Sequence, residues 1–192
     1  MAVGVYPGSF NPPTVAHVAI AEAAHRQCGL DRLDLVVSRV PLGKEAQDLV
    51  RLEDRLTVLE RIGASRPWLG VRTTDASLLA DVAEGYDVLV VGGDKWAQLV
   101  DPVWYGGSEA ERDEALGRLR RIVVVPRAAH PVGGHEVLEV DAVHLGVSAT
   151  MARAGRMDWM APEAAQFDEL TGAWTDPGRY RRWLGRAAEG PA

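Results

Sequence analysis

Cysteine is nearly absent from this sequence of 192 residues: Cys28 is the single one, so no disulfide can form within the chain. This excludes a small disulfide-stapled scaffold and gives no sign of an oxidising compartment. Long apolar runs are absent too, since none approaches the roughly 20 residues that span a bilayer. Residues 1–5 carry no basic region of the kind that opens a signal peptide. We therefore expect a cytoplasmic protein without a membrane partner.

An excess of basic residues is also missing. Asp and Glu number 27 against 21 Lys and Arg, which gives a formal net charge of −6. Because neutralising the phosphates of a nucleic acid needs a concentrated basic surface, we expect no nucleic-acid partner. The 47% hydrophobic and 25% charged residues are ordinary for a folded protein and unlike a disordered or collagen-like chain. The length suits a single domain over residues 1–192, with residues 155–192 expected as a C-terminal helical extension.

Short apolar runs alternate with helical patterns along the chain. Strands are predicted at residues 2–6, 33–37, 68–72, 88–91 and 122–125, with weaker signals at 136–140 and 144–147. Helices are predicted at residues 14–28, 52–64, 77–84, 108–121, from 148 onward, 162–170 and 177–188. This alternation predicts the α/β class and a doubly wound, Rossmann-like parallel sheet. Since ligands of such sheets bind beyond the carboxyl ends of the strands, we expect the site at residues 7–17, 41–44, 92–96 and 148–153.

The segment G-S-F-N-P-P-T-V-A-H at residues 8–17 carries the clearest chemistry. Gly8 permits close approach of the backbone to a ligand, and the prolines stiffen the loop. If Thr14 begins the following helix, Thr14 and His17 lie on one face of its first turn. There a hydroxyl and an imidazole join free backbone N–H groups at the positive end of the helix dipole, an arrangement that binds phosphate. A capping threonine beside a buried histidine is the structural alternative.

This segment resembles the first motif of the nucleotidylyltransferases of the HxGH type, G-[ST]-F-[DN]-P-x-[HT]-x-G-H. Their second motif, I-S-S-T-x-x-R, is similar to V-S-A-T-M-A-R at residues 147–153. Between the two motifs, G-G-D at residues 92–94 and the later Trp104 resemble the bacterial nicotinate mononucleotide adenylyltransferases of this family. The resemblance covers nearly the whole chain and implies the nucleotidylyltransferase fold.

The resemblance implies an enzyme that transfers AMP from ATP to a phosphate-bearing acceptor, most closely nicotinate mononucleotide, and releases pyrophosphate. It also implies Mg²⁺ bound with ATP and held largely by phosphate oxygens and water. The catalytic residues that it implies are His17, Thr14 and Lys44. Nucleotide binding is implied for Gly8, Ser9, Phe10, Asp94, Ser148, Thr150 and Arg153, and acceptor binding for Trp96 and Trp104.

Three departures from the family pattern leave alternatives open. Ala16 stands where the first motif has glycine, and Ala149 stands where the second motif has serine. Residues 73–79 read T-T-D-A-S-L-L, without the S-Y-T-x-x-T-L segment that helps bind the pyridine carboxylate in the nicotinate enzymes. One alternative keeps the chemistry but changes the acceptor, to phosphopantetheine or to a sugar or alcohol phosphate that receives a cytidylyl group. Another is a catalytically weakened nucleotide-binding protein. The sequence also leaves a homo-oligomer open.

Overall fold

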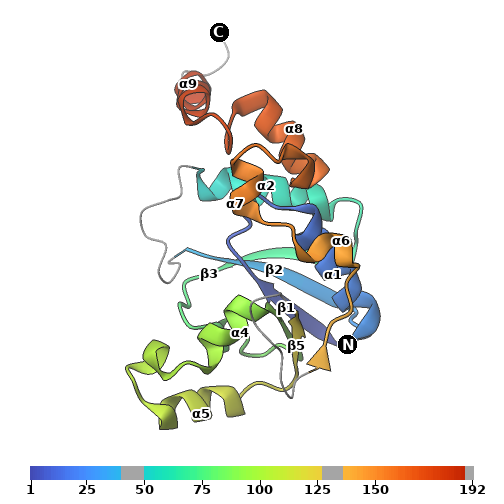
Figure 1. Ribbon diagram of the computed structural model, residues 1–192, viewed down its shortest axis with the longest axis vertical. Helices are drawn as coiled ribbons and strands as arrows, with labels where there is room; N and C mark the ends of the chain where they lie inside the picture. Colours follow the sequence, from blue (N-terminus) through green and yellow to red (C-terminus); the bar gives the residue numbers. More distant parts are fainter. Residues whose placement is uncertain (40–49, 127–135, 189–192) are drawn as a thin grey trace.

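A six-stranded sheet organises the protein (Figure 1). The computed structural model describes residues 1–39, 50–126 and 136–188. The strands are β1 (Val3–Pro7), β2 (Arg32–Ser38), β3 (Leu69–Thr74), β4 (Val88–Gly92), β5 (Ile122–Val125) and β6 (Glu136–Val137). They lie in the order β3-β2-β1-β4-β5-β6, and all neighbouring pairs are parallel. The chain thus builds outward from β1 in both directions, which confirms the predicted doubly wound sheet.

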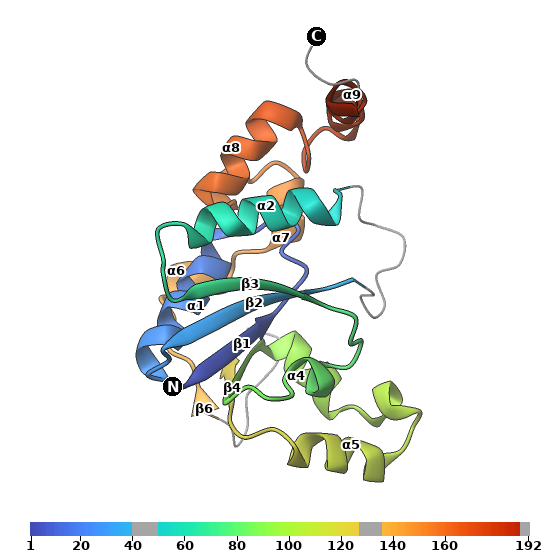
Figure 2. The ribbon, with the colours of Figure 1, turned by 180° about the vertical axis from the view of Figure 1, so that it is seen from behind.

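Helices cover both faces of this sheet (Figures 1 and 2). The α-helices are α1 (Val15–Gln27), α2 (Leu52–Gly63), α3 (Leu79–Val82), α4 (Gly93–Val100), α5 (Glu109–Gly117), α6 (Ala142–Leu145), α7 (Ala149–Arg153), α8 (Pro162–Thr171) and α9 (Pro177–Ala188). One core contains side chains of α1, α2, α8 and α9, and the other contains side chains of α3, α4 and α5. Along β4 the residues alternate between the two, with Val88 and Val90 in the first core and Leu89 and Val91 in the second. This explains why the strand is apolar at every position.

The prediction of a strand at residues 144–147 is wrong. A short helix, α6 (Ala142–Leu145), occupies this part of the chain instead. Asp141 caps it, because its carboxylate accepts a hydrogen bond from the Val143 N–H at 3.1 Å. The weak strand predicted at 136–140 is present only as the two residues of β6. Within the described parts of the chain, no helix has the length and apolar character needed to cross a bilayer.

A buried carboxylate lies on β2. Asp34 is only 2% exposed and accepts hydrogen bonds from Arg32 Nε and Arg72 Nε, both at 2.7 Å. It also accepts one from the Tyr86 hydroxyl at 3.0 Å. Burial, together with the nearby Asp34 charge, raises the pKa of Tyr86 to about 12, so this hydroxyl remains a donor. Gly70 of β3 makes room for the cluster, since a Cβ there would lie 2.0 Å from Asp34 Oδ1.

We expect Asp34→Asn to lower the free energy of unfolding by about 2–3 kcal/mol, because it leaves two guanidinium groups without their shared carboxylate. The matched control is Asp75→Asn, which breaks the ion pair between Asp75 and Arg39. The Asp75 side chain is 76% exposed. That change should cost no more than about 0.5 kcal/mol. Urea unfolding of both variants measures the difference, and equal losses would contradict the importance of the buried cluster.

Candidate active site

A cavity of about 270 Å³ opens at the carboxyl ends of the strands. The last residues of β1 to β5 all line it: Pro7, Ser38, Thr74, Gly92 and Val125. This is the edge at which ligands of doubly wound sheets bind. Most of the remaining lining comes from the segments that follow these strands, so the cavity lies where the sequence predicts the site.

The structure brings half of the twelve predicted site residues to this cavity. Those that line it are Gly8, Ser9, His17, Asp94, Ser148 and Thr150. Phe10, Thr14, Arg153, Trp96 and Trp104 lie outside its lining. Lys44 falls outside the residues that the structure describes.

Thr14 and His17 form a reciprocal capping box at the start of α1. The His17 N–H donates to Thr14 Oγ1 at 3.3 Å, and the Thr14 N–H donates to His17 Nδ1 at 3.0 Å. Because Nδ1 accepts a backbone N–H, a neutral His17 ring carries its proton on Nε2. Thr14 itself is 1% exposed, so its hydroxyl serves the histidine and the helix end rather than the cavity surface. The helix begins at Thr14, as the sequence predicts.

Phe10 supports the cavity from beneath. Its φ of 45° is unusual for a residue with a side chain. The ring packs edge-on against Tyr6 and His17, with centroids 5.6 and 5.1 Å apart. This packing requires glycine at position 8, because a Cβ there would lie 2.9 Å from the Phe10 ring. Phe10 therefore shapes the wall through its contacts with residues that line it.

Arg153 joins the two predicted motifs. Its Nη1 donates to the Asn11 carbonyl of the first motif, and its Nη2 donates to Thr150 Oγ1 at 3.2 Å. Asn11 is buried, with 6% of its surface exposed. In this structure the guanidinium holds the loop before α1 against α7, so the two halves of the site share one arginine.

Two cationic residues of the cavity were not predicted from the sequence. Arg55 of α2 is 7% exposed and donates from Nη1 to the Ser9 carbonyl at 2.9 Å. Lys95 of α4 is half-buried and donates from Nζ to Gln98 Oε1 at 2.8 Å. Lys95 follows directly after a predicted site residue, Asp94, and that proximity was the available signal. Arg55 lies inside a helix with ordinary amphipathic spacing, a pattern that predicts a solvent-facing arginine.

The charge of the lining suits an anionic ligand. Among the described lining residues, His17, Arg55 and Lys95 can carry positive charge, and Asp94 is the one acidic side chain. The first turn of α1 holds no acidic residue, so its N-terminal dipole is not opposed locally. Within the described ranges, no group of three or more His, Cys, Asp or Glu side chains could hold a metal ion.

The two tryptophans expected at the acceptor pack against the core formed by α3, α4 and α5. Trp104 lines a separate cavity of about 20 Å³, shared with Leu79 and Gln98. Leu79 and Gln98 also line the large cavity. Trp104 therefore lies behind the wall at which α4 meets the segment after β3.

A parallel sheet with a helix N-terminus and a cavity lined by cationic side chains at its switch point is typical of nucleotide-binding α/β proteins. Residues 5–155 match the family model described as cytidylyltransferase-like, and the chain belongs to this family. This confirms the resemblance to nucleotidylyltransferases that the two motifs predict.

Individual relatives agree with that assignment. A protein of Salinibacter ruber named "Probable nicotinate-nucleotide adenylyltransferase" is 28% identical over 184 residues, which cover 86% of this chain and 93% of the relative. A protein of Agrobacterium fabrum with the same name is 41% identical over 78 residues, 41% of each chain. The solved structure of Plasmodium falciparum nicotinic acid mononucleotide adenylyltransferase complexed with APC superimposes with a TM-score of 0.63. It covers 88% of this chain and 94% of that one at 11% identity, so it shows the shared fold.

We expect Thr14→Ala to lower the free energy of unfolding by about 1 kcal/mol, as loss of an N-cap does. It should also raise the share of His17 rings with the proton on Nδ1, which ¹⁵N imidazole spectra measure, because the Thr14 hydroxyl that lies 2.9 Å from Nδ1 is lost. Thr14→Ser should restore both. Ser108→Ala, which removes the N-cap of α5, is the matched control: a similar loss of stability with an unchanged His17 spectrum. An unaltered spectrum in Thr14→Ala would show that the Thr14 hydroxyl does not control the tautomer.

Proposed function

We propose that the protein transfers AMP from ATP to nicotinate mononucleotide and releases pyrophosphate. The observation that supports this most directly is the Thr14–His17 pair, which places an imidazole on the cavity wall at the N-terminus of α1. The cationic lining fits a polyphosphate ligand. The names of the relatives, one of which matches 86% of the chain, favour the nicotinate acceptor.

The reaction needs positioning and charge stabilisation more than covalent chemistry. A phosphate oxygen of the acceptor attacks the α-phosphorus of ATP, and the bond from that phosphorus to the bridging oxygen breaks. The electron pair of the broken bond leaves with pyrophosphate, so no covalent enzyme intermediate forms. His17, with its proton on Nε2, donates a hydrogen bond to the α-phosphate as negative charge develops there.

The other residues bind and orient the nucleotide. We assign Ser148 and Thr150 to the β- and γ-phosphates, and Asp94 to the ribose hydroxyls. For Lys44, which lies outside the described residues, only the resemblance to the family supports a role at the phosphates. Mg²⁺ bound with the triphosphate would neutralise part of its charge through phosphate oxygens and water. The lining fits this role, since it offers Asp94 and hydroxyl groups rather than a set of carboxylates.

We expect purified protein to release pyrophosphate from ATP, Mg²⁺ and nicotinate mononucleotide in a coupled assay. His17→Ala should lower kcat by about 100- to 1000-fold, because one donor to the developing charge is lost. His25→Ala is the matched control, since His25 lies on the same helix but stacks on Trp68 at 4.2 Å. It should leave kcat unchanged.

The same assay separates the alternatives. Release with phosphopantetheine, or with CTP and an alcohol phosphate, would keep the chemistry and replace the acceptor or the nucleotide. Binding of ATP without release of pyrophosphate in the presence of any acceptor would identify the weakened nucleotide-binding protein. An unchanged kcat in His17→Ala would contradict the role of the histidine.

Lys95 offers a second way to decide which mononucleotide is the acceptor. Its ammonium lies on the wall that α4 forms with residues 74–79, the segment that lacks the expected pyridine-binding motif. Nicotinate differs from nicotinamide by one negative charge on the ring substituent, and Lys95 is the cation of this wall. We assign it to that carboxylate.

Lys95→Met should therefore lower kcat/KM for nicotinate mononucleotide by about 10- to 100-fold, the value of one charge-assisted hydrogen bond. The value for nicotinamide mononucleotide should change little, and Lys95→Arg should keep most of the preference. Steady-state kinetics with both acceptors measure this ratio. Equal losses for the two acceptors would show that Lys95 binds a group that they share.

A further inference from the structure

The chain beyond residue 155, where the family match ends, returns to the loop before α1. The Ala161 N–H donates to the Pro13 carbonyl at 3.0 Å, and Met160 forms an antiparallel bridge with Thr14. Trp174 Nε1 donates to Asn11 Oδ1 at 2.6 Å, across 163 residues of sequence. Both ribbon views show α8 next to α2 and α7, on the side of the sheet that carries α1 (Figures 1 and 2).

The Trp174–Asn11 hydrogen bond is a buried one. Trp174 is 5% exposed and Asn11 is 6% exposed, so water does not readily replace either partner. The indole N–H can only donate, which fixes the orientation of the Asn11 amide. The carbonyl of the same residue accepts from Arg153. Asn11 is thus held at its side chain by the C-terminal segment and at its backbone by the second motif.

Trp174 has a rigid support of its own. The carboxylate of Asp168 is fully buried. It accepts hydrogen bonds from the backbone N–H groups of Trp174, at 2.6 Å, and Thr175, at 3.1 Å. Its other oxygen accepts from the Thr175 hydroxyl. The Trp174 ring packs edge-on against Phe167 at 5.8 Å. The contacts of Trp174 with its own segment, α8 and the turn that follows it, therefore fix the position of the indole independently of Asn11.

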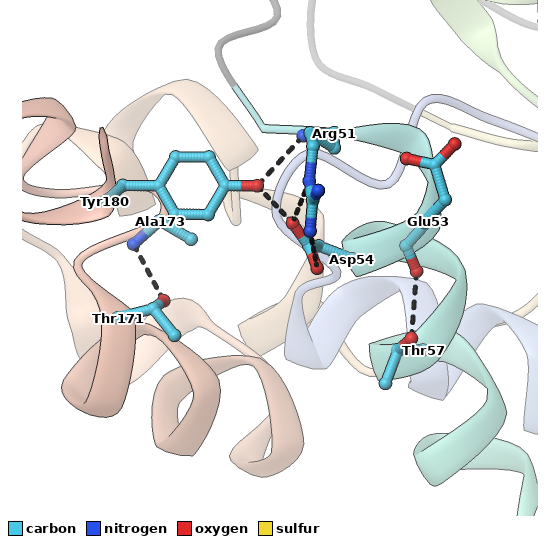
Figure 3. A network of polar contacts seen from close by, with 7 residues as sticks. All are labelled: Arg51, Glu53, Asp54, Thr57, Thr171, Ala173 and Tyr180. Carbon is cyan, nitrogen blue, oxygen red and sulfur yellow. Dashed lines mark hydrogen bonds and ion pairs between the residues drawn. The ribbon is translucent and has the colours of Figure 1, made fainter. Parts of the chain in front are cut away.

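A second contact of the same segment joins Tyr180 to Arg51 and Asp54 at the start of α2 (Figure 3). The Tyr180 hydroxyl donates to Asp54 and accepts from the Arg51 N–H at 3.1 Å, while Arg51 Nε donates to Asp54 at 3.0 Å. Burial and the hydrogen bond with Asp54 raise the pKa of Tyr180, which keeps its hydroxyl protonated. The next residue of α2 is Arg55, whose guanidinium holds the Ser9 carbonyl.

These contacts converge on Phe10. Its neighbours Ser9 and Asn11 are both anchored, and its own φ of 45° is an unfavourable conformation that needs such support. The Phe10 ring in turn packs against His17. We propose that Trp174 is a positioning residue: through Asn11 it fixes the loop that sets the His17 ring, so the segment beyond the family match is part of the catalytic unit. The kinetic part of this inference rests on the proposed nucleotidyl transfer.

The test is Trp174→Phe, which keeps an aromatic ring on Phe167 and removes the indole N–H. We expect kcat to fall about tenfold or more with KM for both substrates nearly unchanged, because small misplacements of catalytic groups act on turnover. Amide hydrogen exchange in residues 8–17 should become faster. Trp183→Phe is the matched control, since Trp183 also packs edge-on against Phe167, at 5.7 Å. It should change neither kcat nor exchange in residues 8–17.

A double-mutant cycle separates positioning from general stability. Asn11→Ala removes the side-chain oxygen that accepts the hydrogen bond from the indole. Trp174→Phe should therefore cause no further loss of kcat in that background. Additive losses, an unchanged kcat in Trp174→Phe, or an equal loss in Trp183→Phe would each overturn the proposal. If wild-type protein releases no pyrophosphate with any acceptor, the proposed function fails. Exchange in residues 8–17 then decides the role of Trp174 by itself.

Discussion

The reciprocal hydrogen bonds between Thr14 and His17 connect the fold to the chemistry. A helix end leaves backbone N–H groups without partners, and these two residues satisfy two of them. The same bonds determine which ring nitrogen of His17 carries the proton. A proton on Nδ1 would place two donors against each other, so the helix cap selects the neutral tautomer with its proton on Nε2. The stability of α1 and the tautomer of His17 thus depend on one pair of contacts.

The sheet and the position of the site follow from local patterns in the sequence. Apolar runs such as residues 88–91 are long enough to identify buried strands, and the segments after them line the cavity. The error at residues 144–147 arose because H-L-G-V is a short, mostly apolar run, which fits a strand or a helical turn equally well. The structure resolves this through Asp141, a cap just before the run.

Other parts of the site could not be predicted because they depend on distant residues. Nothing local marks Trp174 as a partner of Asn11, or Tyr180 as a partner of Asp54. The sequence identifies Arg153 by its motif, but its contact with the Asn11 carbonyl appears only when the two motifs meet in space. Net charge is equally uninformative at this scale. The chain as a whole carries −6, whereas the described cavity lining has more cationic than acidic side chains. A negative net charge disfavours long polyanions, whereas the local charge of the cavity favours a small anion.

The separation of 163 residues between Asn11 and Trp174 also sets an order of events during synthesis. At about 5–20 residues per second, the ribosome adds the tryptophan roughly 10–30 s after the asparagine. All six strands of the sheet, and both motifs, are synthesised before the tryptophan. The nascent chain can therefore pair its strands before the indole that holds its first loop exists. The final packing of this loop must then wait for the end of synthesis, although the loop is among the first segments to leave the ribosome.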